Sequence, residues 1–196
     1  NGGYCVTKEQ EVIYKNNIPE KDIRSLLHYA KKREDLTFSF MSEKEISLNR
    51  ATPEVLAMYQ QVNVPTPPIR DYERDFDLDT VMQINVFISP EEEAEFMRNV
   101  MPNSVASRWT PIFADVNPMG QSKKIGIDVF LNHFNFTPEE TMSFGDGGND
   151  ITMLAHTHIG VAMGNANPEV KEIADYITDS VDDNGIWNAL KHFNII

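Results

Sequence analysis

The sequence predicts an α/β protein in which a parallel sheet with helices is joined to a compact α+β domain. Two observations carry this prediction. Strand and helix patterns alternate strictly after Gly120, which is typical of a parallel sheet, whereas the middle of the chain mixes strands and helices without that order. The expected division is residues 1–18 as a remnant of the parallel-sheet domain, residues 19–116 as the α+β domain, and residues 117–196 as the closing half of the parallel-sheet domain.

The first elements are short. Residues 4–14 contain two apolar runs, YCV and EVIY, around a polar turn, which predicts a hairpin. From Pro19 the apolar residues recur at helical spacing, and the alternation of Leu36, Phe38 and Phe40 then predicts a strand. Too little apolar surface lies in the hairpin for it to fold alone.

The second half of the α+β domain carries clear helix starts. Thr52 and Pro53 stand at the cap and first position of a helix, and residues 81–88 (VMQINVFI) read as a strand. Ser89 with Pro90 and Glu92 predicts a capping box at the start of another helix. Strand character is expected to resume over residues 105–116, with Trp109, Ile112 and Phe113 in it and Trp109 in the domain's core.

The last third predicts a helix from Ser122 to Phe134, then strands at TMSF, IGVAM and DYIT with helices between them, and a final helix. Parallel sheets bind ligands beyond the carboxyl ends of their strands. The loop after TMSF is therefore the expected place for chemistry.

Composition restricts the partners. The chain of 196 residues has 30 acidic and 17 basic residues, a formal charge of -13, which opposes binding to nucleic acid or to an anionic membrane surface. A small charged metabolite is the expected partner, and a phosphorylated metabolite would require local positive charge from lysine, metal or helix N-termini. Cys5 is the only cysteine and is expected to be a packed thiol, so the composition fits a cytoplasmic protein. A monomer or small homo-oligomer without membrane association is expected.

The segment FGDGGNDITML places Asp146 and Asp150 on either side of a glycine-rich turn between a strand and a helix. Magnesium prefers one or two protein carboxylates together with waters and phosphate oxygens, so these two residues predict a Mg²⁺ site. Gly147 and Gly148 are expected to let the backbone turn tightly next to the ion. The alternative interpretation is an ordinary glycine turn in which Asp150 caps the following helix.

A lysine favours the functional interpretation. Lys123 follows Gly120-Gln121-Ser122 at the start of the preceding helix, and a cation there could stabilise a phosphoryl group in its transition state. Its neighbour Lys124 is the alternative, and spacing alone does not separate the two.

Four segments, GQSKKIGIDVF, FGDGGNDITML, IGVAMGNANPEVKEIADYIT and DDNGIWNALKHF, together resemble the closing half of a Cof-type phosphatase of the haloacid dehalogenase (HAD) superfamily. Upstream, NGGYCV, EVIYKNNIP, VMQINVFISPEEE and SRWTPIFADV resemble that family's hairpin and inserted cap. The resemblance covers nearly the whole chain and implies a Rossmann-like core, an α+β cap and Mg²⁺-dependent hydrolysis of phosphate monoesters, sugar phosphates among them.

The resemblance also implies residue roles. Asp146 corresponds to the direct magnesium ligand and Asp150 to the carboxylate that holds the ion or its waters. Lys123 corresponds to the catalytic, phosphate-stabilising lysine. Asn149 and Asn165 correspond to residues that bind substrate or phosphate, although both could be simple turn residues.

The resemblance further implies a nucleophilic aspartate in a DxDGT motif, which the sequence lacks. The segment DFDLDTV, from Asp75 to Val81, imitates it with Asp77 and Asp79, but it has no glycine and follows a charged stretch rather than an apolar strand. We expect it to be a solvated loop. The nucleophile is then expected upstream, on about 60 to 80 further residues that form two βαβ units.

Other functions compete with this one. The chain could be a non-catalytic or truncated protein that keeps the cap and metal loop as a binding or structural unit. A related GDGxND motif occurs in ion-pumping ATPases, but these need membrane helices, which the sequence does not predict. In the cap, Arg108 could grip an anion and Trp109 could stack on a sugar.

Overall fold

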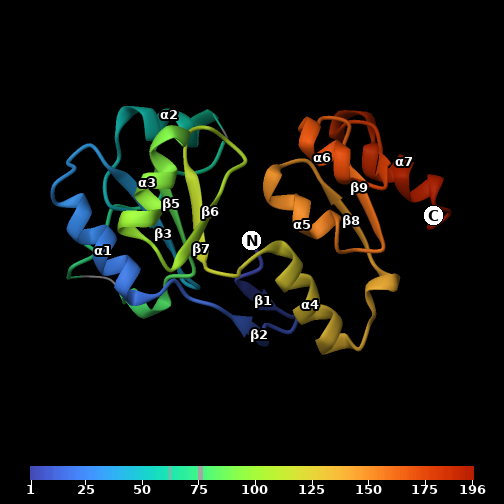
Figure 1. Ribbon diagram of the computed structural model, residues 1–196, viewed down its shortest axis with the longest axis horizontal. Coiled ribbons are helices and arrows are strands. Elements are labelled where there is room, and N and C mark those ends of the chain that lie inside the picture. Colours follow the sequence, from blue (N-terminus) through green and yellow to red (C-terminus); the bar gives the residue numbers. More distant parts are fainter. Residues whose placement is uncertain (62, 75–76) are drawn as a thin grey trace. The chain divides into compact units, whose positions relative to one another are not determined.

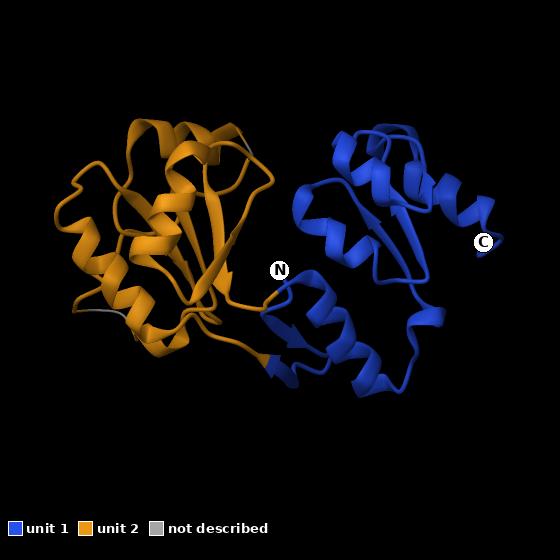
Figure 2. Ribbon diagram, viewed as in Figure 1, with its two compact units in different colours: residues 1–14, 122–196 blue, residues 15–121 orange. Residues whose placement is uncertain are grey.

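The computed structural model describes residues 1–61, 63–74 and 77–196 (Figure 1). These residues form two compact units, one made of residues 1–14 and 122–196 (unit 1) and one of residues 15–121 (unit 2; Figure 2). Unit 2 begins earlier and ends later than the middle domain expected at 19–116. Its entering and leaving segments are joined, since Asn16 Nδ2 donates to Gln121 Oε1 over 3.0 Å.

Unit 2 contains a five-stranded antiparallel sheet in the order β4-β3-β5-β7-β6. Its strands are β3 (Thr37–Met41), β4 (Ile46–Leu48), β5 (Gln83–Phe87), β6 (Ser104–Ser107) and β7 (Ala114–Pro118). Its helices are α1 (Glu20–Ala30), α2 (Pro53–Gln61) and α3 (Pro90–Val100), with a short 3₁₀ turn η1 (Leu78–Thr80).

Alternation along the strands divides the side chains between the two faces of this sheet. Phe38 and Phe40 of β3 pack with α1 and α3 on one face, where the largest cluster of buried side chains lies. On the other face, Leu48 and Phe87 pack against α2 together with Phe113. The sheet is therefore covered by helices on both sides, although only in part on the second.

Two polar contacts fix the helices of unit 2. Asp22 of α1 is buried and accepts hydrogen bonds from Asn103 N (2.9 Å) and from Ser104 Oγ (2.7 Å). At the start of α3, Ser89 N donates to the carboxylate of Glu92 over 3.1 Å, as the expected capping box requires.

The prediction of a strand over residues 105–116 is wrong for the middle of that range. Strands β6 and β7 occupy only the two ends, and residues 108–113 form a loop between them. The expectation that Trp109 lies in the core is also wrong, because this side chain is 53% exposed. Apolar residues such as Ile112 imitated a strand although that side chain also faces solvent.

Unit 1 contains a three-stranded parallel sheet in the order β10-β9-β8, which confirms the parallel pairing predicted from the alternating pattern. Its strands are β8 (Met142–Gly145), β9 (Ile159–Ala162) and β10 (Tyr176–Ile177), and a separate two-stranded sheet joins β1 (Tyr4–Val6) to β2 (Val12–Lys15). Its helices are α4 (Lys123–Phe134), α5 (Ile151–Leu154), α6 (Pro168–Ile173) and α7 (Gly185–His192), with 3₁₀ turns η2 (Pro138–Glu140), η3 (Gly148–Asp150) and η4 (Val181–Asp183).

The core of unit 1 is small. Leu154, Ala162 and Val170 are buried where α5, β9 and α6 meet. Cys5 of the hairpin is buried beside Gly126 of α4, and burial raises the pKa of its thiol. The prediction of a packed rather than reactive cysteine is thereby confirmed. No helix in the described part of the chain has the length and apolar character needed to cross a bilayer.

Candidate metal and phosphate site

The loop after β8 brings the two predicted carboxylates together. Asp146 and Gly147 follow the strand directly, and their backbone N–H groups donate to Asp150 Oδ2 over 2.9 and 3.1 Å. Asp150 itself ends the turn η3 and leads into α5. The carboxylate of Asp150 therefore folds back over the loop and holds its backbone in a tight curve.

Gly145 is the glycine that this loop requires. A Cβ at Gly145 would lie 2.5 Å from Cβ of Asp150, closer than side chains approach. The expectation that Gly147 provides special backbone freedom is wrong, since its φ of -110° is open to other residues. Gly148 has no positive φ either. The demand for glycine thus comes from close packing at the strand end.

Lys123 is the first residue of α4, and its ammonium pairs with Asp150 Oδ1. The side chain of Lys123 is 32% exposed and that of Asp150 only 6%. Burial alone would raise the pKa of Asp150, but the Lys123 ammonium and the two backbone N–H donors outweigh it and hold that pKa below its usual range. Spacing could not choose between Lys123 and Lys124, whereas the geometry pairs Lys123 with this carboxylate.

Asp146 and Asn165 meet at the mouth of the loop. Asp146 is exposed, and its Oδ2 accepts a hydrogen bond from Asn165 Nδ2 over 3.3 Å. Asn165 comes from the loop after β9, and its Oδ1 accepts from Val181 N over 3.2 Å. The backbone is tied as well, because Asn167 N donates to Asp146 O over 3.0 Å. The carboxyl ends of two adjacent parallel strands therefore contribute to one group of polar side chains.

Asn149 points elsewhere within unit 1. Its Nδ2 donates to Asn1 Oδ1, in the first residue of the chain, over 3.2 Å. The structure therefore brings Lys123, Asp146, Asp150 and Asn165 into one connected set, and Asn149 shares the turn η3 with Asp150.

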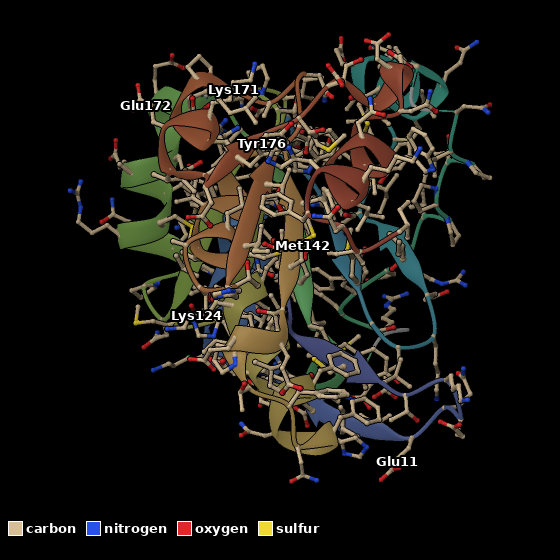
Figure 3. All side chains as sticks on the ribbon, turned by 90° about the vertical axis from the view of Figure 1, so that its right-hand side faces the viewer. Glu11, Lys124, Met142, Lys171, Glu172 and Tyr176 are labelled. Carbon is tan, nitrogen blue, oxygen red and sulfur yellow. The ribbon has the colours of Figure 1, made fainter. Side chains whose placement is uncertain are left out.

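Sequence reasoning missed one residue that supports this set. Lys171 of α6, labelled in Figure 3, donates to Gly164 O over 2.7 Å and so braces the loop that carries Asn165. The only sequence signal was a lysine in the helix after the GNA segment, and such lysines are usually solvated.

The residues present fit a magnesium ion in part. Asp146 offers an exposed carboxylate, the ligand type that Mg²⁺ prefers, but both oxygens of Asp150 already accept hydrogen bonds. Within the described residues no group of three or more His, Cys, Asp or Glu side chains could hold a metal. An ion here would need most of its ligands from water, from a phosphate or from other protein segments.

The DxD-like segment lies in unit 2. Asp77 and Asp79 are exposed, and Asp77 Oδ1 accepts a hydrogen bond from Asp79 N over 3.1 Å at the turn η1. The prediction of a solvated loop is confirmed for these two residues, while Asp75 lies outside the described residues.

Comparisons with known proteins agree on the family. A sequence profile of the haloacid dehalogenase-like hydrolases matches residues 1–190. YkrA of Bacillus subtilis, a candidate phosphatase by name, is 36% identical over 195 residues, which are 99% of this chain and 74% of that protein. The solved structure of BT4131, described as a HAD subclass IIB sugar phosphatase, is 41% identical with a TM-score of 0.89, covering 100% of this chain and 74% of that one. The solved structure of BT1666 of Bacteroides thetaiotaomicron, described as a phosphatase of the HAD superfamily, is 39% identical with a TM-score of 0.88. The match covers 100% of this chain and 72% of that one.

Proposed function

Because this chain belongs to the haloacid dehalogenase-like hydrolases, we propose that it carries the cap and the metal loop of a magnesium-dependent phosphatase for small phosphate monoesters. Sugar phosphates are the proposed substrates, in line with the description of BT4131 as a sugar phosphatase. Unit 2 corresponds to the cap and unit 1 to the closing part of the core.

One observation carries this proposal. Asp150 receives the Lys123 ammonium on one oxygen and two backbone N–H groups of the metal loop on the other. The ammonium at the start of α4 is thereby paired with the loop that carries the exposed Asp146 carboxylate, so both charges are held in one connected set. In an acidic chain, this is a place where a phosphoryl group meets local positive charge.

The roles follow from the chemistry of each side chain. Asp146 would bind Mg²⁺ directly, and Asp150 would hold the ion's waters while it orients Lys123. The ion, when bound, supplies a positive charge that neutralises phosphate oxygens. Lys123 would stabilise the negative charge that develops on the phosphoryl group, and Asn165 and Asn149 would position phosphate or substrate.

The proposed reaction uses an aspartate nucleophile that lies upstream of this chain. Its carboxylate oxygen attacks phosphorus, the P–O bond to the substrate alcohol breaks, and the second aspartate of the DxDGT motif gives the leaving oxygen a proton. That aspartate then takes a proton from the water that attacks phosphorus, which cleaves the phospho-aspartate and releases phosphate. Support comes from the missing DxDGT motif and from relatives such as YkrA, of which this chain covers 74%.

The test compares two proteins, the 196-residue chain and the full-length product of its gene. Hydrolysis of p-nitrophenyl phosphate and of a panel of sugar phosphates is measured with and without Mg²⁺. We expect Mg²⁺-dependent activity in the full-length protein alone. Inactivity of both would favour the non-catalytic alternative, and activity of the short chain would return attention to Asp77 and Asp79.

The metal assignment has its own test. Asp146→Asn in the full-length protein should weaken Mg²⁺ binding, measured by calorimetry, and lower kcat by roughly a hundredfold or more. Unchanged activity at limiting Mg²⁺ would refute the assignment of Asp146.

A further inference from the structure

Another polar contact of unit 1 lies outside the candidate metal and phosphate site. Nε2 of His156 stands 2.5 Å from Oδ1 of Asp128, which is a residue of α4. A carboxylate only accepts hydrogen bonds, so Nε2 is the protonated nitrogen and the donor of this bond. The side chain of His156 is 20% exposed and that of Asp128 is 36% exposed. Hydrogen bonds to an ionised group are stronger than neutral ones, and partial burial protects this one from solvent.

The backbone of His156 is fixed at the end of α5. Its N–H donates to Met153 O over 3.0 Å, and the N–H of Thr157 donates to the same oxygen over 3.1 Å. The Thr157 hydroxyl lies 2.6 Å from the hydroxyl of Ser143 in β8, the strand that leads into the metal loop. The turn after α5 is therefore joined to β8 through Thr157 and to α4 through His156.

Two polar contacts thus join α4 to the segment that runs from the metal loop through α5. Lys123 pairs with Asp150 near the start of both segments, and Asp128 pairs with His156 further along both. The distance from Lys123 to Asp128 along the helix axis is about 7.5 Å, at about 1.5 Å for each residue. Contacts at two points along a helix limit its rotation, whereas a single contact would leave the helix free to pivot.

The apolar core of unit 1 does not take over this task. Its buried cluster, with the partly buried side chains packed on it, comes from β8, α5, β9, α6 and the residues that follow these elements. Among the described residues, α4 contributes no side chain to that cluster. Helix α4 instead lies against the hairpin, where Gly126 is beside Cys5. The orientation of α4 towards α5 therefore depends on polar contacts more than on this core.

We propose that Asp128 and His156 are positioning residues for Lys123, because their pair fixes α4 against α5 and so holds the Lys123 ammonium at the phosphate site. Lysine has a flexible four-carbon side chain, so a displaced helix start would let this charge move away from Asp150. A misplacement of about 1 Å can lower the rate of a reaction about a hundredfold. The inference rests on the proposed function, since both residues act through the proposed catalytic lysine.

The first test replaces the histidine by two different amides in the full-length protein. The side-chain nitrogen of glutamine reaches as far as Nε2 of histidine, whereas that of asparagine reaches only as far as Nδ1. We expect His156→Asn to lower kcat for p-nitrophenyl phosphate about tenfold with KM almost unchanged, and His156→Gln to keep most of the activity. His158→Asn is the matched control, because His158 is an exposed histidine two residues along the chain.

The second test determines whether the effect passes through Lys123. His156→Asn is combined with Lys123→Ala, and the residual kcat of the double variant is compared with that of Lys123→Ala alone. If the pair acts by positioning the lysine, His156→Asn should not lower kcat further once the lysine is absent. A further tenfold loss in this background would show general damage to unit 1 and would overturn the inference.

A third measurement does not depend on activity. Lysine side chains are acetylated with a limiting amount of acetic anhydride, and mass spectrometry compares the labelling of Lys123 with that of its neighbour Lys124. An ammonium held in an ion pair is acetylated slowly, because only the neutral amine is a nucleophile. We expect His156→Asn to raise the labelling of Lys123 relative to Lys124 about threefold, and His156→Gln to leave this ratio near that of the parent protein.

The outcomes separate this inference from the proposed function. An active enzyme in which His156→Asn and His156→Gln behave alike would overturn the role of the pair and leave the phosphatase intact. If no substrate is hydrolysed, the labelling alone decides, and an unchanged ratio in His156→Asn overturns the inference. If His156→Asn does not fold, Asp128→Ala replaces it in all three measurements, because alanine is well tolerated in a helix such as α4.

Discussion

Unit 2 and unit 1 are built in different ways. In the described residues, unit 2 has a main cluster of fifteen buried apolar residues under α1 and α3 and a second cluster under α2, whereas the main cluster of unit 1 has five. The five-stranded sheet of unit 2 is antiparallel, and the three strands of unit 1 are parallel. The residues proposed to bind metal and phosphate, Lys123, Asp146, Asn149, Asp150 and Asn165, all lie in unit 1. The proposed site thus lies in the unit with the smaller core, and a few polar contacts hold its shape.

The largest expected effect concerns the core of unit 2. Phe40 is fully buried and stacks on Tyr72 with 4.1 Å between the ring centroids, so Phe40→Ala should lower the free energy of unfolding by about 3–5 kcal/mol. Urea denaturation, followed by the fluorescence of Trp109 in a Trp187→Phe background, measures this free energy of unfolding. Ile46→Ala, on the same sheet but 45% exposed, is the control. A loss of equal size in both variants would contradict the contrast between core and surface.

The next effect concerns the polar site of unit 1. Lys123→Ala in the full-length protein should lower kcat by roughly 10²–10³-fold, because the ammonium next to Asp150 is lost from the phosphate site. Lys124→Ala is the matched control, one residue along the same helix and labelled in Figure 3. Steady-state hydrolysis of p-nitrophenyl phosphate measures kcat of both variants. If both variants lost activity equally, local helix damage and not the Lys123 charge would be responsible.

A third prediction uses a buried hydroxyl of unit 2. Burial raises the pKa of Tyr72 to about 12, and its OH donates to Ser47 O. The folded state therefore favours the neutral phenol, and this preference contributes about 2–3 kcal/mol to the free energy of unfolding. The contribution is fully present below a pH of about 10 and is lost as the pH rises through about 12. Tyr72→Phe should cost about 1 kcal/mol at pH 7 yet flatten the alkaline loss of stability.

Chemical denaturation between pH 8 and pH 12 tests this prediction. Tyr4→Phe in the hairpin of unit 1 is the control, since Tyr4 is 37% exposed. An alkaline transition of undiminished size in Tyr72→Phe would show that another group is responsible.

The smallest effect concerns a helix start. Ser89→Ala removes the N-cap residue of α3 and should destabilise unit 2 by about 1 kcal/mol. Glu95→Ala in the middle of the same helix should change stability less, because alanine is a good helix former. Thermal unfolding by circular dichroism compares the two variants, and equal shifts in Tm would argue against a capping role for Ser89.

Most elements of the fold could be predicted because their apolar residues recur with a clear period. The strand at Phe38 and Phe40, the capping box at Ser89 and the parallel strands after Gly120 are confirmed. The loop at residues 108–113 could not be predicted, since Arg108 fixes it through contacts with Glu93 and with distant carbonyl groups. Local sequence contains no record of such long-range contacts.

The candidate site was predictable in its residues but not in its connections. A strand end followed by GDGGND indicated where Asp146 and Asp150 lie, because parallel strands place such loops at one edge. The need for glycine at Gly145 and the brace from Lys171 arise from packing between segments that are separate in sequence. The roles of these residues in metal and phosphate binding stay predictions.

The hydrogen bond between Asn16 and Gln121 joins the two ends of unit 2, one at the residue where the chain enters the unit and one where the chain leaves it. A domain whose two ends lie side by side can be exchanged as a whole, because its host needs only two adjacent attachment points. Residues 15–121 could therefore be grafted between the matching ends of a related hydrolase without changes to the sheet of that host. In the same way, another inserted domain could replace residues 15–121 in this protein. Recombination in evolution could use the same two attachment points to combine one host domain with many different inserted domains.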